Sequence, residues 1–371
     1  MPTILQYMKK YYVLLSFVSL VCMLTACKKS NQTNTPSIID SLYFPPINSN
    51  NWQTISPTSL GWDVTALNNL NTYLSNKNTK AFIILKNGKI VTEQYFGAFT
   101  ADSLWYWASA GKTMTALLVG IAQREGLLNI NDISSKYLGS GWTSEPLDKE
   151  NKITIRHQLT MTTGLDDGVP DNDCTLPACL QYKADAGTRW AYHTGAYTLL
   201  DQVIANASGM PFNNYFQQKI RDKIGMNGSW IKIPNSNNVY YSNARSMAKF
   251  GLLLLNKGNW NNLPVLNDSI YFQQQINTSQ NLNLSYGYLT WLNGKSSCMV
   301  PTLQVVFPQS LIPNAPADMF AALGKNDQKI YVVPSQNLVI IRMGNAADSS
   351  QFSVTAFDNE LWGKLKQALR L

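Results

Sequence analysis

A serine and a lysine three residues apart, Ser109 and Lys112, open an apolar stretch and could form a nucleophile with its own proton acceptor. In a helix, residues three apart lie on one face, about one turn from each other. A serine at the start of a helix lies near free backbone N–H groups, and the helix dipole stabilises an anion formed there. A neutral lysine could accept the serine proton, and the activated serine could then attack a carbonyl carbon.

The Ser-x-x-Lys spacing alone is weak evidence, because Ser229 with Lys232 and Ser246 with Lys249 also have it. Ser246 falls inside an apolar helical stripe, and Ser229 follows a glycine-rich turn, so neither starts a helix. Ser109 follows the aromatic stretch “DSLWYWAS”, which could wall a pocket, and it begins a helical pattern. We therefore take Ser109 as the candidate nucleophile.

Several other chemistries lack their sequence signatures. The chain has no G-x-S-x-G, H-E-x-x-H, P-loop or dinucleotide fingerprint. Its two histidines, His157 and His193, are too few for a histidine-rich metal centre, and we expect neither metal nor cofactor. The 371 residues carry a net charge of +8, but the basic residues are scattered, so no nucleic-acid partner is expected. Hydrophobic residues at 45% exclude a disordered chain.

The N-terminus has the pattern of an export signal. Two lysines precede an apolar run at 11–26 that is shorter than the roughly twenty residues needed to cross a bilayer. The run ends in “LTAC”, which resembles a bacterial lipobox and predicts cleavage before Cys27 and a lipid on that residue. The alternatives are an ordinary signal peptide or an uncleaved anchor. We expect a lipoprotein signal peptide over 1–27, a tether and N-terminal extension over 28–60, and an exported protein anchored on the periplasmic or cell-surface side of a bacterial membrane.

An exported protein can form disulfides, and three cysteines follow the predicted signal segment: Cys174, Cys179 and Cys298. Cys174 and Cys179 frame the short loop “CTLPAC” and could close a small ring. The alternative is a pair of half-buried free thiols. We expect the disulfide, with Cys298 left reduced.

The pattern of apolar residues predicts how the candidate nucleophile is held. Apolar runs on both sides of Asn87-Gly88 predict a hairpin, because this pair suits a tight turn with positive φ. A helix follows from Ser109, the middle of the chain is mostly helical, two β runs lie within 329–344, and the tail at 357–371 is an amphipathic helix. This order predicts an α/β (α+β) fold. One antiparallel sheet, built from both ends of the chain, is flanked by helices, and a mostly helical subdomain is inserted between them.

Several segments of the sequence resemble segments of a known family. The segment “WYWASAGKTMTALLVGIAQREGLLNINDISSKYL” resembles the nucleophile helix of the serine β-lactamase and penicillin-recognising hydrolase superfamily, on the class C side. The segments “ITIRHQLTMTTGL”, “GTRWAYHTGAYTLLDQVI” and “FAALGKNDQKIYVVPSQNLVIIRM” resemble later family segments, in family order. The resemblance implies a β-lactamase/transpeptidase-like fold and a β-lactamase-related serine hydrolase domain over residues 61–371.

The same resemblance implies catalytic roles. Ser109 matches the nucleophile and Lys112 its partner lysine. Tyr192 matches the second-motif tyrosine, which works with the lysine as general base and later donates a proton to the leaving group. From sequence alone, Tyr192 could also be an ordinary half-buried aromatic residue. The backbone N–H groups of Ser109 and Lys325 match the oxyanion hole.

Two departures from the family pattern bear on the substrate. Thr194 replaces the usual Asn of the second motif. The third motif reads Ala322-Leu323-Gly324, without the usual first-position base that helps to hold a carboxylate. Lys325 could replace that base, but on a continuing strand its side chain would point to the face opposite that of Gly324. The pattern is closer to the esterase branch that includes 6-aminohexanoate-dimer hydrolases.

We therefore expect a serine hydrolase that cleaves an ester or amide of a small molecule or short peptide. The alternative is a penicillin-binding or sensor-type module of the same fold, without turnover. The oligomeric state stays open. Aromatic residues near the motifs could line the pocket or fill the core, and His193 could orient substrate or be structural. The candidate pocket residues are Trp107, Trp190, His193, Thr194, Leu323 and Gly324.

Overall fold

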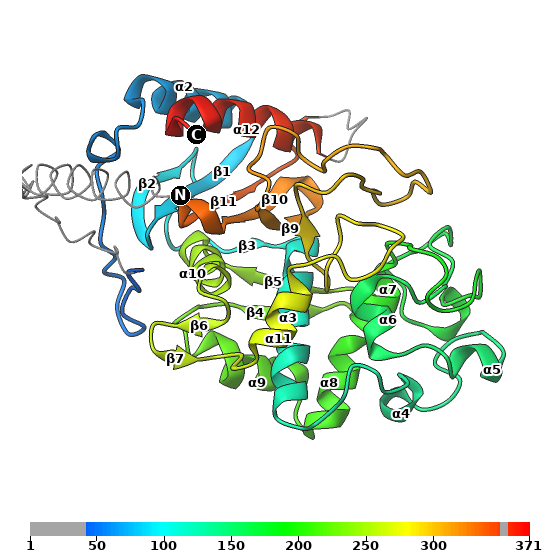
Figure 1. Ribbon diagram of the computed structural model, residues 1–371. Coiled ribbons are helices and arrows are strands. Elements are labelled where there is room, and N and C mark those ends of the chain that lie inside the picture. Colours follow the sequence, from blue (N-terminus) through cyan, green and yellow to red (C-terminus); the bar gives the residue numbers. More distant parts are fainter. Residues whose placement is uncertain (1–41, 349–354) are drawn as a thin grey trace, which may run out of the picture. The chain divides into compact units, whose positions relative to one another are not determined.

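A six-stranded antiparallel sheet, built from both ends of the chain, is the centre of the fold (Figure 1). The computed structural model describes residues 42–348 and 355–371, so the predicted signal segment and Cys27 lie outside the described residues. The strand order is β2-β1-β11-β10-β9-β8, which confirms the expected sheet. Its strands are β1 (Thr79–Lys86), β2 (Lys89–Tyr95), β8 (Trp291–Leu292), β9 (Phe320–Gly324), β10 (Gln328–Val333) and β11 (Leu338–Gly344).

The strands at the centre of the sheet are buried on both faces. Every residue of β10 and β11 is buried, and most of β1 is too, which explains their nearly continuous apolar sequences. Asn87 and Gly88, both with positive φ, join β1 to β2 as the predicted tight turn. A 3-10 turn at Pro334–Gln336 joins β10 to β11.

Helices cover both faces of the sheet. The two helices α2 (Val64–Asn76) and α12 (Ala356–Leu369) pack together on one face (Figure 1). On the other face lies α10 (Ala244–Leu255), which contacts β1, β10 and β11. Almost every residue of α10 is buried, so its run of leucines fills the space between the sheet and the rest of the chain.

The helix that begins after the candidate nucleophile, α3 (Gly111–Arg124), leads from the sheet into the helical part of the chain. Twelve of its residues are buried, from Gly111 to Ala122. A separate small core of Trp142, Leu165, Leu180 and their neighbours supports the inserted subdomain. The other helices are α4 (Ser135–Leu138), α5 (Leu147–Glu150), α6 (Ile155–Thr160), α7 (Thr194–Thr198), α8 (Leu200–Ser208), α9 (Phe212–Phe216) and α11 (Ser269–Gln275).

Some short elements were not expected from the sequence. A second sheet has the order β3-β5-β4, and part of the aromatic stretch before Ser109 forms its strand β3. The backbone of the described N-terminal extension bonds to the β1–β2 hairpin through Tyr43 and Ile55. None of the described helices is both long and apolar enough to span a bilayer. The remaining strands are β3 (Trp105–Tyr106), β4 (Ser229–Lys232), β5 (Asn238–Ser242), β6 (Asn259–Trp260) and β7 (Leu263–Pro264).

Candidate active site

Ser109 lies in a 3-10 turn, Ala108–Ala110, that runs directly into α3. The side chain is partly exposed, and Lys112 Nζ lies 2.9 Å from Ser109 Oγ. The preceding residue, Ala108, has a φ of 47°, in the left-handed region that residues with a Cβ rarely adopt. Such strained backbone is common next to reactive groups, where the surrounding fold holds it in place. The predicted serine–lysine pair is therefore in contact.

Lys112 is buried at the inner end of this pair, with 1% of its surface exposed. Its Nζ lies 4.0 Å from the ring centre of Tyr197 and 5.1 Å from that of Tyr192. Burial lowers the pKa of the Lys112 ammonium from 10.5 to about 7, while the negative charge of Asp173 opposes the shift. A substantial fraction of the lysine is therefore neutral at neutral pH and able to accept a proton.

The third predicted catalytic residue, Tyr192, completes the contact. Burial raises the pKa of its phenol well above 10, and an interaction with the Ser109 side chain opposes this shift. The ring stacks on Trp291 with a centroid distance of 5.9 Å. Because the Lys112 pKa is lowered and the Tyr192 pKa is raised, the lysine is the better final proton acceptor. The tyrosine is suited to relay a proton.

The pKa of Lys112 predicts the pH dependence of activity. A lysine with a pKa of about 7 is protonated below that pH, and only its neutral form can accept the serine proton. We expect kcat/KM for a neutral ester to rise with pH through about 7 and to level off above it. Initial rates from pH 5 to 9 on a substrate without titratable groups measure this. A rising limb centred near the ordinary lysine pKa would contradict the assignment.

The third motif lies directly against the nucleophile turn. Gly324 ends β9, and a Cβ added there would lie 2.3 Å from the carbonyl oxygen of Trp107 and 3.0 Å from the backbone N of Ala110. Only glycine permits this approach. The N–H of Lys325 follows immediately, next to the turn that carries the Ser109 N–H. This placement is compatible with the expected oxyanion hole.

Lys325 does not continue the strand, in contrast to the expectation. β9 ends at Gly324, and Lys325–Asp327 form a tight turn in which Asn326 and Asp327 have φ values of 60° and 61°. Asn and Asp tolerate this left-handed conformation better than most residues. As a result, Lys325, which is exposed, is among the residues that line the pocket over Ser109.

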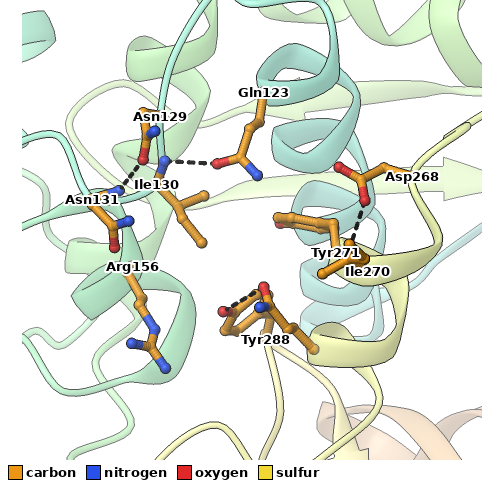
Figure 2. A pocket seen from close by; sticks show the side chains of 10 residues that line it. Gln123, Asn129, Ile130, Asn131, Arg156, Asp268, Ile270, Tyr271 and Tyr288 are labelled. Carbon is orange, nitrogen blue, oxygen red and sulfur yellow. Dashed lines mark hydrogen bonds between the residues drawn. The ribbon is translucent and has the colours of Figure 1, made fainter.

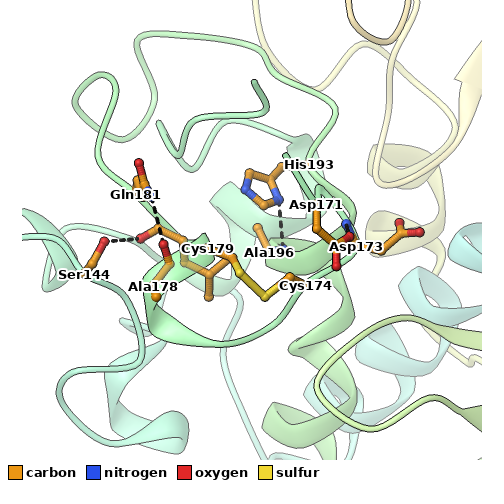
Figure 3. Close-up of a disulfide and its surroundings, with 10 residues drawn as sticks. Ser144, Asp171, Asp173, Cys174, Ala178, Cys179, Gln181, His193 and Ala196 are labelled. Carbon is orange, nitrogen blue, oxygen red and sulfur yellow. Dashed lines mark hydrogen bonds between the residues drawn. A yellow bond between two sulfur atoms is a disulfide. The ribbon is translucent and has the colours of Figure 1, made fainter. Parts of the chain in front are cut away.

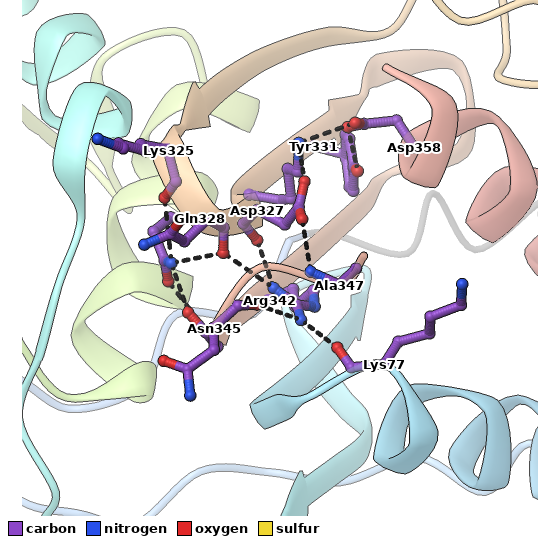
Figure 4. A network of polar contacts seen from close by, with 12 residues as sticks. Lys77, Lys325, Asp327, Gln328, Tyr331, Arg342, Asn345, Ala347 and Asp358 are labelled. Atoms are coloured by element: carbon purple, nitrogen blue, oxygen red, sulfur yellow. Dashed lines mark hydrogen bonds and ion pairs between the residues drawn. The ribbon is translucent and has the colours of Figure 1, made fainter. Parts of the chain in front are cut away.

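A buried network of charges holds this turn from behind (Figure 4). Arg342 donates hydrogen bonds to the backbone carbonyls of Asn326 and Asp327, at 3.3 and 2.8 Å. Lys329 forms ion pairs with Asp327 at 3.2 Å and with Asp358 at 2.8 Å. Buried charges are tolerated only when they are paired and hydrogen-bonded in this way. The network therefore fixes the backbone that follows Gly324.

A pocket of about 370 Å³ opens over Ser109 and Tyr192. Part of its wall comes from segments that the sequence did not single out: Trp291, residues 300–311 and Thr355. Its apolar side is formed by Trp291, Val300, Pro301, Leu311 and Leu323, and its polar side by Thr302, Gly324, Lys325, Asn326, Asp327, Lys329 and Thr355. Leu323 and Gly324 are thus in the pocket as expected. The long coil that supplies residues 300–311 has no periodic pattern from which this role could have been read.

Two tryptophans that were candidates for the pocket wall fill the core. Trp107 is fully buried, donates from Nε1 to Ser242 Oγ at 2.8 Å, and packs on Tyr240. Trp190 is 1% exposed and packs behind Tyr192, with ring centres 6.3 Å apart. Neither is among the described residues that line the pocket. Large aromatic side chains near a motif can equally well support it from the inside.

His193 and Thr194 are also behind the site, in the backbone that follows Tyr192. His193 is 1% exposed and caps α7, since its Nδ1 accepts a hydrogen bond from the N–H of Ala196 (Figure 3). Burial lowers the pKa of His193 to about 4, so the ring is neutral at pH 7. Thr194 is 8% exposed, and its hydroxyl group does not line the pocket. The structure therefore gives both residues a structural position.

A disulfide lies beside the same segment (Figure 3). Cys174 and Cys179 are bonded, with their Cα atoms 5.9 Å apart. Cys298 is reduced and buried. The carbonyl of Cys174 lies against Gly195, which places the disulfide loop directly on the start of α7.

The other candidates from the sequence are not part of this site. Ser246 bonds to Asn227, and Lys249 donates to the carbonyl of Gly225, so that pair supports α10. Ser229 and Lys232 lie on the short strand β4. No cluster of three or more His, Cys, Asp or Glu side chains suited to a metal occurs in the part of the chain that the structure describes.

A second cavity, of about 360 Å³, lies at the far end of α3 (Figure 2). Its polar wall includes Gln123, Asn129, Arg156 and Tyr288. No serine or cysteine is among the described residues that line it. The pocket over Ser109 is the candidate active site.

Several solved structures share the fold of this chain. A Bacillus anthracis protein described as a 6-aminohexanoate-dimer hydrolase superposes with a TM-score of 0.68 at 18% identity, covering 89% of this chain and 90% of that one. A Bacteroides dorei protein described as a β-lactamase gives 0.66 at 18% identity, covering 84% and 100%. These likenesses establish the β-lactamase/transpeptidase-like fold.

The chain belongs to the β-lactamase family, whose model matches residues 77–361. An uncharacterized protein of Alkalihalophilus pseudofirmus is 25% identical over 304 residues, which cover 72% of this chain and 84% of that protein. A β-lactamase of Pseudomonas fluorescens is 27% identical over 179 residues, covering 43% and 47%. The Escherichia coli D-alanyl-D-alanine-carboxypeptidase/endopeptidase AmpH is 29% identical over 139 residues, covering 34% and 36%. The chain thus matches less than half the length of each of these two enzymes.

Proposed function

We propose that this protein is a serine hydrolase that cleaves esters or simple amides through an acyl-enzyme on Ser109. One observation carries the proposal: a buried lysine with a lowered pKa lies 2.9 Å from a partly exposed serine hydroxyl, and the side chain of Tyr192 interacts with the same serine. This is the arrangement that activates a serine without histidine. The pocket next to it has room for a small acyl group or leaving group.

In the proposed first step, Ser109 Oγ attacks the substrate carbonyl carbon while its proton passes to Lys112, directly or through Tyr192. The carbonyl electron pair moves onto oxygen, where the N–H groups of Ser109 and Lys325 stabilise the charge. The bond to the leaving group then breaks, and Tyr192 returns a proton to that group. A water molecule next attacks the acyl-enzyme and gives its proton to the same pair. The acid is released, and Ser109 recovers its proton.

We predict that β-lactam hydrolysis will be poor compared with ester hydrolysis. Ala322 cannot form the charge-assisted hydrogen bond that a third-motif base would make to a carboxylate, which is worth roughly 1.5–3 kcal/mol. Lys325 lines the pocket, but it is exposed, and an exposed ion pair adds only about 0–1 kcal/mol. A panel of nitrocefin, p-nitrophenyl butyrate and aminohexanoyl or D-alanyl amides on one preparation tests this. Nitrocefin as the best substrate by kcat/KM would contradict it.

The second candidate function is penicillin binding without turnover. Two observations favour it: Thr194 stands where relatives have Asn, and Ala322 replaces the third-motif base. Either change could slow deacylation or substrate capture. Labelling with a fluorescent penicillin separates the two functions. A stable label on Ser109, with no ester or amide turnover, would favour the binding module over the hydrolase.

We also propose that the chain is exported and anchored by lipid on Cys27, because “LTAC” ends an apolar run of signal-peptide length. In cells fed a radioactive fatty acid, the full-length protein should take up label and stay with the membrane fraction. The Cys27→Ala variant should take up none. Equal labelling of both forms would rule out Cys27 as the lipid site, and no labelling of either would favour an ordinary signal peptide.

A further inference from the structure

The backbone around Tyr192 is held by one side chain from a separate loop. The Nδ2 group of Asn172 donates to the carbonyl of Tyr192 at 3.1 Å, and its Oδ1 accepts from the N–H of Thr194 at 2.9 Å. The backbone carbonyl of Asn172 accepts from the N–H of Gly195 at 2.8 Å. A single residue thus bonds to the backbone of two residues of the second motif, Tyr192 and Thr194, and of Gly195, which follows it.

The loop that carries Asn172 is itself fixed on both sides. On one side, Asp167 pairs with Arg189 at 2.5 Å, and Asn172 Nδ2 also lies 3.3 Å from the Asp167 carbonyl. On the other side, Cys174 closes the disulfide ring with Cys179. A Cβ added to Gly195 would lie 2.0 Å from the carbonyl oxygen of Cys174, so the loop rests directly on the start of α7.

We propose that Asn172 is a positioning residue for Tyr192, and that the Cys174–Cys179 disulfide keeps it in place; this inference rests on the proposed serine hydrolase function. The Asn172 amide holds the backbone of Tyr192. This fixes the position of the Tyr192 phenol, which must stay close to Ser109 for proton transfer. An amide is needed because a carboxylate keeps the acceptor for Thr194 and loses the donor for Tyr192. A small displacement of a proton-transfer group lowers kcat far more than substrate affinity.

Amide hydrogen exchange tests the contact without any substrate. The Thr194 N–H donates to the side-chain oxygen of Asn172, which Asn172→Ala removes, so this variant should speed the exchange of Thr194 at the start of α7. Peptides from α3, which the loop does not hold, should be unaffected. Uniform deprotection of the whole domain would mean a general loss of stability and would overturn the proposal. So would unchanged exchange at α7.

Kinetics test the consequence for catalysis. For Asn172→Asp, we expect kcat per active site, titrated with a fluorophosphonate, to fall by about ten- to a hundredfold with little change in KM. The matched control is Asp171→Asn, an amide–carboxylate exchange one position away, at a side chain that bonds within the loop to the N–H of Asp173. The control should keep full kcat. A lower active fraction with unchanged kcat per site would indicate a merely structural role and overturn the proposal.

The disulfide is tested with the same assay. Dithiothreitol should lower kcat in the parent and in Cys298→Ser. The Cys174→Ser/Cys179→Ser double variant should have a low kcat without reductant, and dithiothreitol should not lower it further. A double variant with parental kcat would overturn the role of the ring. A different result would contradict the proposed function itself: a Ser109→Ala variant that keeps its activity. The Asn172 inference fails if turnover depends on Ser109 and Asn172→Asp still matches the control.

Discussion

Replacing Ser109 by alanine is expected to abolish turnover of p-nitrophenyl butyrate, with a loss of about four orders of magnitude or more, because no other group can take the place of the nucleophile. The fold should be unaffected, since the Ser109 side chain is partly exposed and alanine already occupies the positions on both sides. Initial rates and a thermal unfolding curve on the same preparation measure both expectations.

Ser229→Ala is the matched control for this variant, because Ser229 has the same spacing to a lysine and lies on β4, outside the pocket. It should keep the parental rate. A Ser109→Ala protein with more than a small fraction of parental activity would mean that another residue is the nucleophile. Equal losses in both variants would point to a contaminant or to general damage.

Replacing Lys112 by methionine should lower kcat/KM by about three orders of magnitude, because the variant keeps the length of the side chain and loses the general base. The same change should raise the melting temperature at pH 7. In the unfolded chain the lysine is fully protonated, whereas burial lowers its pKa to about 7 in the folded protein. Folding therefore works against protonation of Lys112, and methionine removes that penalty.

The control is Lys249→Met, because Lys249 has the same spacing to a serine and donates to the carbonyl of Gly225. It should keep its activity, because Lys249 is not among the described residues that line the pocket over Ser109. If Lys112→Met is less stable than the parent and otherwise active, Lys112 is a structural residue and the proposed base is wrong.

Local patterns in the sequence predicted the sheet and the reactive pair well. The Asn87-Gly88 turn and the apolar runs of β10 and β11 are signals carried by neighbouring residues, and the structure has each of them. Ser109 and Lys112 are brought together by a single helical turn, so their contact also follows from local spacing. The third residue, Tyr192, came from the family resemblance, because its position depends on packing far along the chain.

The residues that were misplaced depend on tertiary structure. Aromatic composition does not distinguish a pocket wall from the core behind it, which is why Trp107 and Trp190 were candidates for the pocket as well as for the core. Lys325 was treated as part of a strand, although Asn326 and Asp327 are residue types that favour a left-handed turn. Asn172 carries no sequence signal, since its role arises only when a distant loop packs on the segment after Tyr192.

The central claim is that the reaction passes through a covalent acyl group on Ser109. The most direct test is an acid quench during the first turnovers of p-nitrophenyl butyrate, followed by intact-mass and peptide-mapping mass spectrometry. The proposed function predicts one butyryl group per chain, located at Ser109 in the peptide that begins α3, and none in Ser109→Ala. Turnover that leaves Ser109 unmodified, with the acyl group on another residue, would contradict it.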